Sequence, residues 1–252
     1  MTMSFTKSVG AAGIALLTCA APALASDMTP PPAGREFSWS VNAAITSDYV
    51  FRGVSQSDND PALQAGIDFA YGILYAGAWG SSIDETFLGG NLEIDYYAGI
   101  KPVLGPATFD LGILYYTYPG VTEPAKGDAE VVELKIGVSG EILPKLTGST
   151  YFYWSPEAAG DNGEYWVSET SLAYALPKVF VFDPTISGTY GYSENVDTDV
   201  ETAWWNVGLT LGYDKFSFDF RYWDSDFDTF NAVSLTNLSD ERFVFTAKVA
   251  FP

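Results

Sequence analysis

Histidine is absent from the 252-residue sequence, and cysteine occurs once. Without histidine, Ser–His and Cys–His nucleophilic catalysis and histidine-ligated metal sites are excluded. One cysteine cannot form a disulfide within the chain. Basic residues are scarce too, with 12 Lys and Arg against 32 Asp and Glu and a formal net charge of -20. Because nucleic-acid binding needs a basic surface, we expect no nucleic-acid partner.

Long apolar runs are also missing, apart from a short one near the N-terminus. Lys7 precedes an apolar run over residues 9–21, and Ala23 and Ala25 follow it. A basic start, a short apolar segment and two small residues spaced two apart are typical of a secretory signal peptide. The run is shorter than the ~20 residues that a membrane-spanning helix needs. We therefore predict a signal peptide over residues 1–25 that is cleaved after Ala25.

The rest of the chain divides into a spacer and a patterned region. Residues 26–36 are rich in proline, which predicts an extended periplasmic segment. From residue 37 to residue 252, apolar and polar residues alternate in about twelve segments, as in Val132, Glu133, Leu134 and Lys135. This period of two is typical of β-strands. Each segment has about nine to eleven residues, the length that a tilted strand needs to cross a bilayer.

The fold class that we predict is all-β: a transmembrane antiparallel up-and-down β-barrel of about twelve strands, with ten or fourteen strands left open. A soluble antiparallel sandwich in the periplasm also has alternating strands and is the competing interpretation. The connections favour the barrel, because outer-membrane barrels alternate long outer loops with short periplasmic turns. The long connections are residues 55–60, 83–91, 120–130, 155–164, 193–201 and 224–241, and the short ones are residues 72–73, 101–108, 141–145, 177–183 and 214–215.

Aromatic residues are abundant near the ends of the predicted strands. In a barrel they would form interfacial belts, with each ring in lipid and its polar tip at the headgroups. The chain also ends in alternating aromatic and apolar residues through Phe251, which resembles the C-terminal signal read by the outer-membrane assembly machinery. Pro252 departs from that pattern by placing the aromatic residue second to last. The expected belt residues are Tyr115, Tyr116, Tyr118, Tyr151, Tyr153, Trp154, Trp166, Trp204, Trp205, Tyr222 and Trp223.

Several strings in the first half resemble a known family. They are ITSDYVFRGVSQS at residues 45–57, PALQAG at 61–66, YAGAWGSSI at 75–83, EIDYYAG at 93–99 and LYYTYPG at 114–120. Together they resemble the TorF family of porin-like proteobacterial proteins, and the resemblance runs from about Ser38 to the C-terminus. It implies an outer-membrane barrel with a pore, and it supplies neither catalytic residues nor a solute.

The polar faces of the strands predict the interior of the barrel. Their charged members are seven acids and five bases, which allow two interpretations. Lys135 stands beside Glu133 and Arg221 beside Asp219, and neighbouring strands can pair these charges in a network that holds a narrow barrel open or plugs it. They could instead line a narrow polar channel that prefers cations. The predicted lumen-lining residues are Asp48, Arg52, Asp68, Glu93, Asp95, Asp110, Glu133, Lys135, Asp219, Arg221, Arg242 and Lys248.

The function that we predict is passive diffusion of small polar or cationic solutes through the outer membrane of a Gram-negative bacterium. The alternative is a non-conducting surface protein whose lumen is plugged by ion pairs and whose acidic loops bind ions or a partner. We expect no enzymatic activity and no cofactor. We also expect no metal site, because the acidic segment that begins at Asp224 lacks the glycine and glutamate of a calcium loop. The expected partners are outer-membrane lipid and lipopolysaccharide, the assembly machinery through the C-terminal strand, and small solutes or cations. An inward fold of residues 224–241 is the predicted gate.

Overall fold

The structure, a computed structural model, describes residues 37–85, 90–121, 129–159, 161–227 and 236–251. The predicted signal peptide, the proline-rich segment and Pro252 lie outside the described residues.

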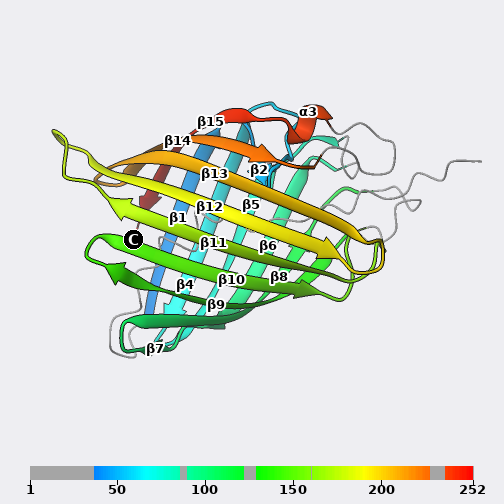
Figure 1. The fold of residues 1–252 in the computed structure, drawn as a ribbon, viewed down its shortest axis with the longest axis horizontal. Coiled ribbons are helices and arrows are strands. Elements are labelled where there is room, and N and C mark those ends of the chain that lie inside the picture. Colours follow the sequence, from blue (N-terminus) through cyan, green and yellow to red (C-terminus); the bar gives the residue numbers. More distant parts are fainter. Residues whose placement is uncertain (1–36, 86–89, 122–128, 160, 228–235, 252) are drawn as a thin grey trace, which may run out of the picture.

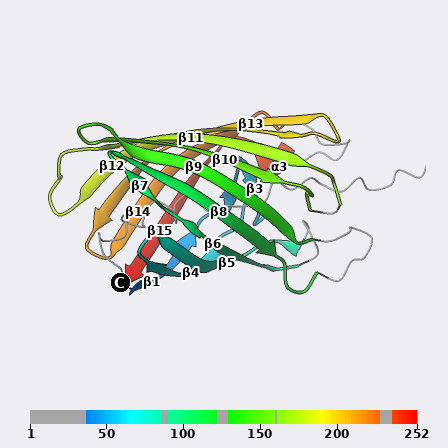
Figure 2. The ribbon, with the colours of Figure 1, turned by 90° about the horizontal axis from the view of Figure 1, so that it is seen from below.

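Twelve long strands form one closed antiparallel sheet, in which each strand pairs with its chain neighbour and the last pairs with the first (Figures 1 and 2). Closure is made by β1 and β15, where Val41 lies opposite Phe251 and Thr46 opposite Thr246. The prediction of a twelve-stranded up-and-down barrel is confirmed. The strands are β1 (Phe37–Thr46), β4 (Ala62–Tyr71), β5 (Leu74–Ser82), β6 (Leu92–Ile100), β8 (Ala107–Thr117), β9 (Val131–Leu143), β10 (Leu146–Ser155), β11 (Tyr165–Ala175), β12 (Asp183–Asn195), β13 (Val200–Tyr213), β14 (Phe216–Ser225) and β15 (Arg242–Phe251).

The remaining elements are short. β7 (Val103–Leu104) extends the sheet beside β8, and the single-turn helix α3 (Thr236–Ser239) precedes β15. β2 (Val50–Phe51) and β3 (Val54–Ser55) pair with each other in a separate two-stranded sheet. Among the described residues, no helix is long and apolar enough to cross a bilayer.

The two faces of the barrel wall differ in polarity, as β9 shows most clearly. Glu133 and Lys135 are buried on the inner face, whereas Leu134 and Ile136 are 47% and 54% exposed on the outer face. The other long strands also expose large apolar side chains outward, from Phe37 on β1 to Phe251 on β15. Since a soluble protein rarely exposes so continuous an apolar surface, the outer face is suited to contact with lipid.

Outward-facing aromatic side chains form two runs of ring contacts across neighbouring strands. Trp166 packs on Phe152 and Tyr192, at ring-centroid distances of 5.7 and 5.3 Å. Tyr222 packs on Trp205 and Phe243, at 5.3 and 5.1 Å. More than half of the predicted belt residues are nevertheless wrong, because they face the interior, where several of their hydroxyls and ring faces contact charged groups. These inward residues are Tyr116, Tyr118, Tyr151, Tyr153, Trp204 and Trp223.

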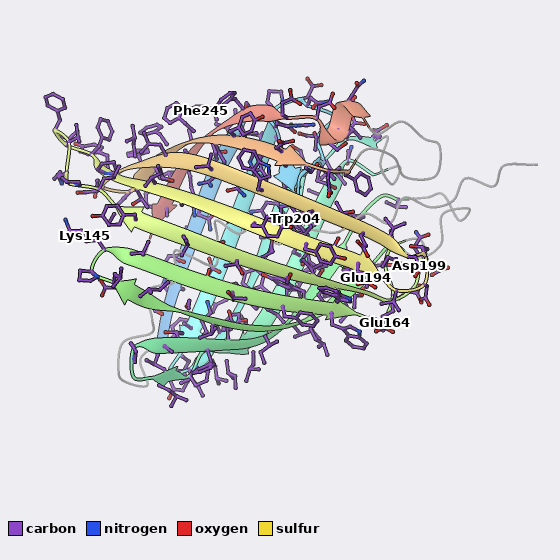
Figure 3. All side chains as sticks on the ribbon, in the orientation of Figure 1. Lys145, Glu164, Glu194, Asp199, Trp204 and Phe245 are labelled. Carbon is purple, nitrogen blue, oxygen red and sulfur yellow. The ribbon has the colours of Figure 1, made fainter. Side chains whose placement is uncertain are left out.

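The two ends of the barrel differ in their connections. The long connections and most acidic loop residues lie at one end, which includes Glu164, Glu194 and Asp199, and the short turns lie at the other, which includes Lys145 (Figure 3). The prediction of a long connection at residues 193–201 is wrong, because β12 and β13 continue into this segment. Glu194 pairs with Glu201, and only residues 196–199 form the turn.

Candidate functional site

The connection after β1 folds into the barrel as a hairpin. β2 and β3 pair Val50 with Ser55 and Phe51 with Val54, and Arg52 and Gly53 form the tip. Both tip residues have left-handed backbone, with φ of 45° and 84°, which matches the two-residue turn whose twist suits a hairpin. Glycine adopts this conformation freely, whereas an arginine there costs about 1–2 kcal/mol. We call residues 50–55 the lumen hairpin.

The tip of the lumen hairpin contacts two separated parts of the wall. Arg52 reaches Glu133 on β9, and the Ser225 hydroxyl of β14 donates to the Gly53 carbonyl at 3.3 Å. A Cβ added at Gly53 would lie 2.7 Å from Cβ of Ser225 and 2.8 Å from Cβ of Trp204, so no larger residue fits. The hairpin therefore lies across the interior, near the end that carries the long connections (Figure 1).

The Arg52 side chain is enclosed by groups of the wall. Its Nη1 and Nη2 donate to the two carboxylate oxygens of Glu133 at 2.7 and 3.1 Å, and neither side chain is exposed. The hydroxyls of Tyr116 and Tyr165 each donate to Glu133 at 2.8 Å. The ring centroid of Tyr153 lies 4.9 Å from the guanidinium carbon, within the range of a cation–π contact.

Three further carboxylates are buried at the same level of the barrel. Glu93 and Asp95 stand on β6 and Glu169 on β11, and Glu93 accepts a hydrogen bond from the Tyr118 hydroxyl at 3.2 Å. One carboxylate oxygen of Asp95, Oδ1, is buried without a hydrogen-bond partner among the described residues. Glu133 and Glu169 thus act electrostatically on the Arg52 guanidinium, and Asp95 lies in range of Glu93 and Glu133. Within the described part of the chain, no three His, Cys, Asp or Glu side chains are grouped to hold a metal ion.

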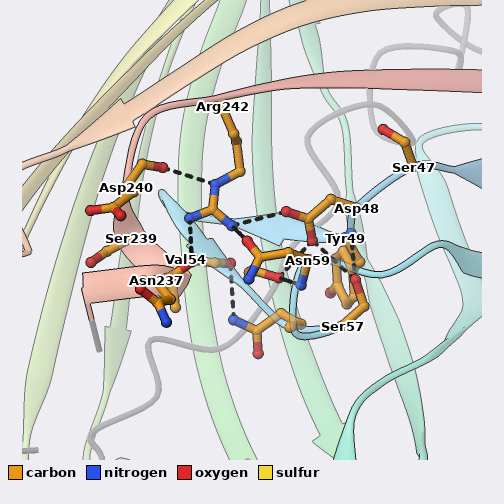
Figure 4. Close-up of polar contacts among 12 residues, drawn as sticks. Ser47, Asp48, Tyr49, Val54, Ser57, Asn59, Asn237, Ser239, Asp240 and Arg242 are labelled. Atoms are coloured by element: carbon orange, nitrogen blue, oxygen red, sulfur yellow. Dashed lines mark hydrogen bonds and ion pairs between the residues drawn. The ribbon is translucent and has the colours of Figure 1, made fainter. Parts of the chain in front are cut away.

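The residues on either side of the lumen hairpin form polar contacts with β15 at the barrel mouth (Figure 4). Asp48 accepts hydrogen bonds from the hydroxyls of Ser55 and Ser57 at 2.6 and 3.0 Å and pairs with Arg242 at 2.9 Å. Arg242 also donates to the carbonyl of Asn237 in α3 at 3.2 Å. α3 contacts β3, so described parts of both the first and the last long connection meet above the hairpin.

A second polar group lies closer to the short turns. Asp110 of β8 pairs with Lys135 at 2.9 Å, accepts a hydrogen bond from the Tyr75 hydroxyl at 2.7 Å and has Lys101 at 3.8 Å. Lys101 Nζ also lies 4.7 Å from the centroid of the Tyr75 ring. Burial lowers the pKa of Lys101, and neighbouring Asp110 acts in the opposite direction. Nearby on β4, Asp68 accepts a hydrogen bond from Tyr97.

The wall formed by β12, β13 and β14 carries a third group. Arg221 pairs with Asp219 at 3.0 Å and donates to Asn206 at 2.6 Å and to Ser187 at 3.0 Å. The Arg221 and Asp219 side chains are 17% and 22% exposed, so this group is more open than the one around Arg52. Lys248 of β15 is half-buried.

The structure thus distributes the twelve predicted residues over five places. They are Arg52, Glu93, Asp95 and Glu133 near the hairpin; Asp48 and Arg242 at the mouth; Asp110 and Lys135 with Asp68 nearby; Asp219 and Arg221; and Lys248 on β15. Glu133 pairs with Arg52 of the lumen hairpin, and Lys135 pairs with Asp110 on the neighbouring strand β8. Asp48 and Arg52 differ from expectation in belonging to the connection after β1 and not to a strand of the wall.

Sequence reasoning missed several residues of the site. Glu169 was overlooked because the same face of its strand carries apolar Tyr165 and Val167, which hid the alternation. Lys101 lies in the short connection after β6, as expected, but its side chain is buried, at 8% exposed, and approaches Asp110. An Arg-Gly pair between Val50-Phe51 and Val54-Ser55 has the spacing of a two-residue hairpin and is the signal that could have revealed the lumen hairpin.

Comparison with known sequences identifies one family. The model of a bacterial protein family of unknown function, Gcw_chp, matches residues 31–251. The search of curated proteins found no match. The TorF resemblance stays a prediction, because the matching family carries a different name.

Solved structures with a similar fold are porins. A structure of the KdgM porin has a TM-score of 0.56 at 9% sequence identity, covering 84% of this chain and 98% of that chain. KdgM in complex with disordered oligogalacturonate has a TM-score of 0.57 at 8% identity, with the same coverage. The NanC porin has a TM-score of 0.51 at 10% identity, covering 85% of this chain and 100% of that chain. At these identities the similarity establishes a porin-type barrel fold.

Proposed function

The chain belongs to the Gcw_chp family of bacterial proteins of unknown function, and we propose that it is an outer-membrane channel. In this proposal it lets small polar solutes diffuse through the outer membrane of a Gram-negative bacterium, and it prefers cations. The porin-type fold and the apolar outer face of the barrel support the location. The signal peptide, the lipid and lipopolysaccharide contacts and recognition of the last strand by the assembly machinery are parts of the same proposal.

The observation that carries the cation preference is the charge around the lumen hairpin. Glu93, Asp95, Glu133 and Glu169 are four buried carboxylates, and Arg52 is paired with one of them, Glu133. Charge in a low-dielectric constriction acts strongly on a passing ion, so this excess of carboxylates favours cations over anions. The group around Asp110 adds no preference for cations or anions, because the charges of Lys101 and Lys135 offset those of Asp68 and Asp110.

The ligand of the KdgM complex does not fit this interior. Oligogalacturonate is a chain of carboxylate-bearing sugars. A lumen with an excess of carboxylates repels such a solute. We therefore do not extend that ligand to this protein.

The second candidate function is a non-conducting surface protein. The lumen hairpin and the fully buried Arg52–Glu133 pair favour it, because together they place a bound segment across the interior. In that case the acidic loops would carry the function, by binding ions or a partner.

Planar-bilayer recording of the refolded protein under a KCl gradient tests the channel. Folding is first verified by the heat-modifiable mobility of a barrel in gel electrophoresis. We expect discrete current steps with a cation-selective reversal potential. Anion-selective steps would refute the role of the buried carboxylates, and a folded barrel that never conducts would support the second candidate.

A further inference from the structure

Arg52 occupies its site as a ligand occupies a pocket. It reaches Glu133 from a connection rather than from the wall, and every other partner of that carboxylate stands on the wall. The two nitrogen–oxygen contacts form the fork-to-fork pair that is specific to a guanidinium. The ring of Tyr153 faces the same group.

The backbone at the tip indicates that the position of Arg52 serves more than the turn. Left-handed backbone is unfavourable for arginine, and asparagine or glycine would form this turn at lower cost. Residues kept in such conformations cluster at functional sites. What this strained position supplies is the contact of the Arg52 side chain with Glu133 and Tyr153.

The site remains strongly attractive to a cation when Arg52 leaves it. Glu133 would keep the two tyrosine hydroxyls and lose the one ion-pair partner that it has among the described residues. Glu169 also acts electrostatically on Arg52, and Asp95 lies in range of Glu93 and Glu133 with its Oδ1 unpartnered among the described residues. A buried carboxylate without a counter-charge is costly, so a free cation of matching shape would be held there.

We propose that Glu133, Tyr116, Tyr165 and Tyr153 form a guanidinium-binding site that Arg52 occupies in cis. Solutes that carry a guanidinium group compete with Arg52 for it, and their binding frees the tip of the lumen hairpin. Guanidinium is preferred to ammonium because the fork of Glu133 and the ring of Tyr153 match a planar cation with paired donors. The inference rests on the proposed channel function for the solute's route, but the site itself can be tested without conduction.

The test compares the wild type with Arg52→Ala, which empties the site. Guanidinium chloride is added to each at millimolar concentration, with sodium chloride and ammonium chloride as references of equal ionic strength. Guanidinium has about four non-hydrogen atoms with which to bind, and so few atoms provide a Kd of about 1 mM or somewhat below. We expect guanidinium to reduce the current through the Arg52→Ala channel by about half near this Kd, and to leave the wild-type current nearly unchanged at the same dose.

Two further variants make the result specific. Arg52→Ala/Glu133→Gln removes the carboxylate as well and should lose the response to guanidinium. Lys178→Ala removes one positive charge from an exposed pair at the short-turn end and should behave as the wild type does.

A second readout is independent of conduction. In Arg52→Ala, millimolar guanidinium should raise the temperature of the heat-modifiable transition, because a ligand that binds only the folded state stabilises it. Sodium and ammonium should not do so.

The outcomes separate the two proposals. If Arg52→Ala responds to guanidinium no more than to sodium in both current and melting, the guanidinium site is refuted whether or not the barrel conducts. If melting responds but no variant conducts, the site stands and the channel function fails.

Discussion

At the scale of residues, the Arg52–Glu133 pair is a fully buried ion pair of the interior. Both side chains are fully buried, and a buried ion pair is stable only when its remaining hydrogen-bonding capacity is satisfied. Tyr116 and Tyr165 provide hydrogen bonds to Glu133, whereas Nε of Arg52 is buried without a hydrogen-bond partner among the described residues. The pair therefore holds the hairpin in place through its geometry more than through net attraction.

Glu133→Gln should destabilise the barrel, because Arg52 would keep its charge and lose its paired carboxylate. We expect a loss of about 3 kcal/mol in the free energy of unfolding, the lower end for breaking a buried pair, since Glu169 remains nearby. Urea unfolding in lipid vesicles, followed by tryptophan fluorescence, measures it. Asp183→Asn is the matched control: its pair with Lys178 is 59% and 70% exposed, so about 0–1 kcal/mol is expected. Equal losses in the two variants would contradict the account.

The sequence predicted residues of the interior better than their partners. Alternation is a local property, and it predicted inward positions for Glu133, Lys135 and Asp110. Pairing depends on which strands are neighbours and on connections that fold back, so the Arg52–Glu133 contact across 81 positions was not predictable. The inward tyrosines were misassigned because an aromatic ring suits either lipid or a packed polar interior.

At the scale of elements, the lumen hairpin is a connection that lies inside the barrel and contacts both β9 and β14. Val50, Phe51 and Val54 pack in the same buried cluster as Trp204 and Tyr116 of the wall. The predicted gate at residues 224–241 is described only in part, and its described helix α3 contacts β3. The sequence predicted a gating connection from its length, whereas the inward position of the hairpin depends on the apolar residues beside its turn, Val50, Phe51 and Val54.

Gly53→Ala should displace the hairpin tip from β13 and β14, because the added Cβ would collide with Cβ of Ser225 and of Trp204. We expect a larger single-channel conductance. Gly72→Ala is the matched control: Gly72 also has positive φ, at +60°, but its added Cβ meets nothing within 4 Å. Both variants carry a backbone cost of about 1 kcal/mol, so a conductance change that appears equally in both would contradict the role of the hairpin.

At the scale of the whole molecule, the fold is an apolar surface turned outward around a polar, partly filled interior. This arrangement follows directly from a period of two in twelve strands, which is why the fold class and strand number could be predicted from sequence. The short length of the connection at residues 196–199 could not be predicted from sequence, because β12 and β13 extend through residues whose polarity is typical of a loop.

Contact between the outer face and lipid makes arginine substitutions depend on depth. Ile136→Arg, near the middle of β9, should cost about 2–4 kcal/mol, and Ile142→Arg, beside the short turn, about 0–1 kcal/mol. Both isoleucines are more than half exposed, at 54% and 59%. The measurement is urea unfolding after refolding into vesicles. Two equally mild effects would favour a soluble protein over a membrane barrel.

The most direct test of the central claim compares the single-channel currents of two proteins in the same bilayer under a KCl gradient. One is the wild type, and the other has residues 50–55 replaced by a Gly-Ser linker. If an acid-lined barrel is narrowed by the lumen hairpin, the replacement increases conductance severalfold and both proteins remain cation-selective. Equal conductance, anion selectivity in either protein, or two folded barrels that carry no current would contradict the account.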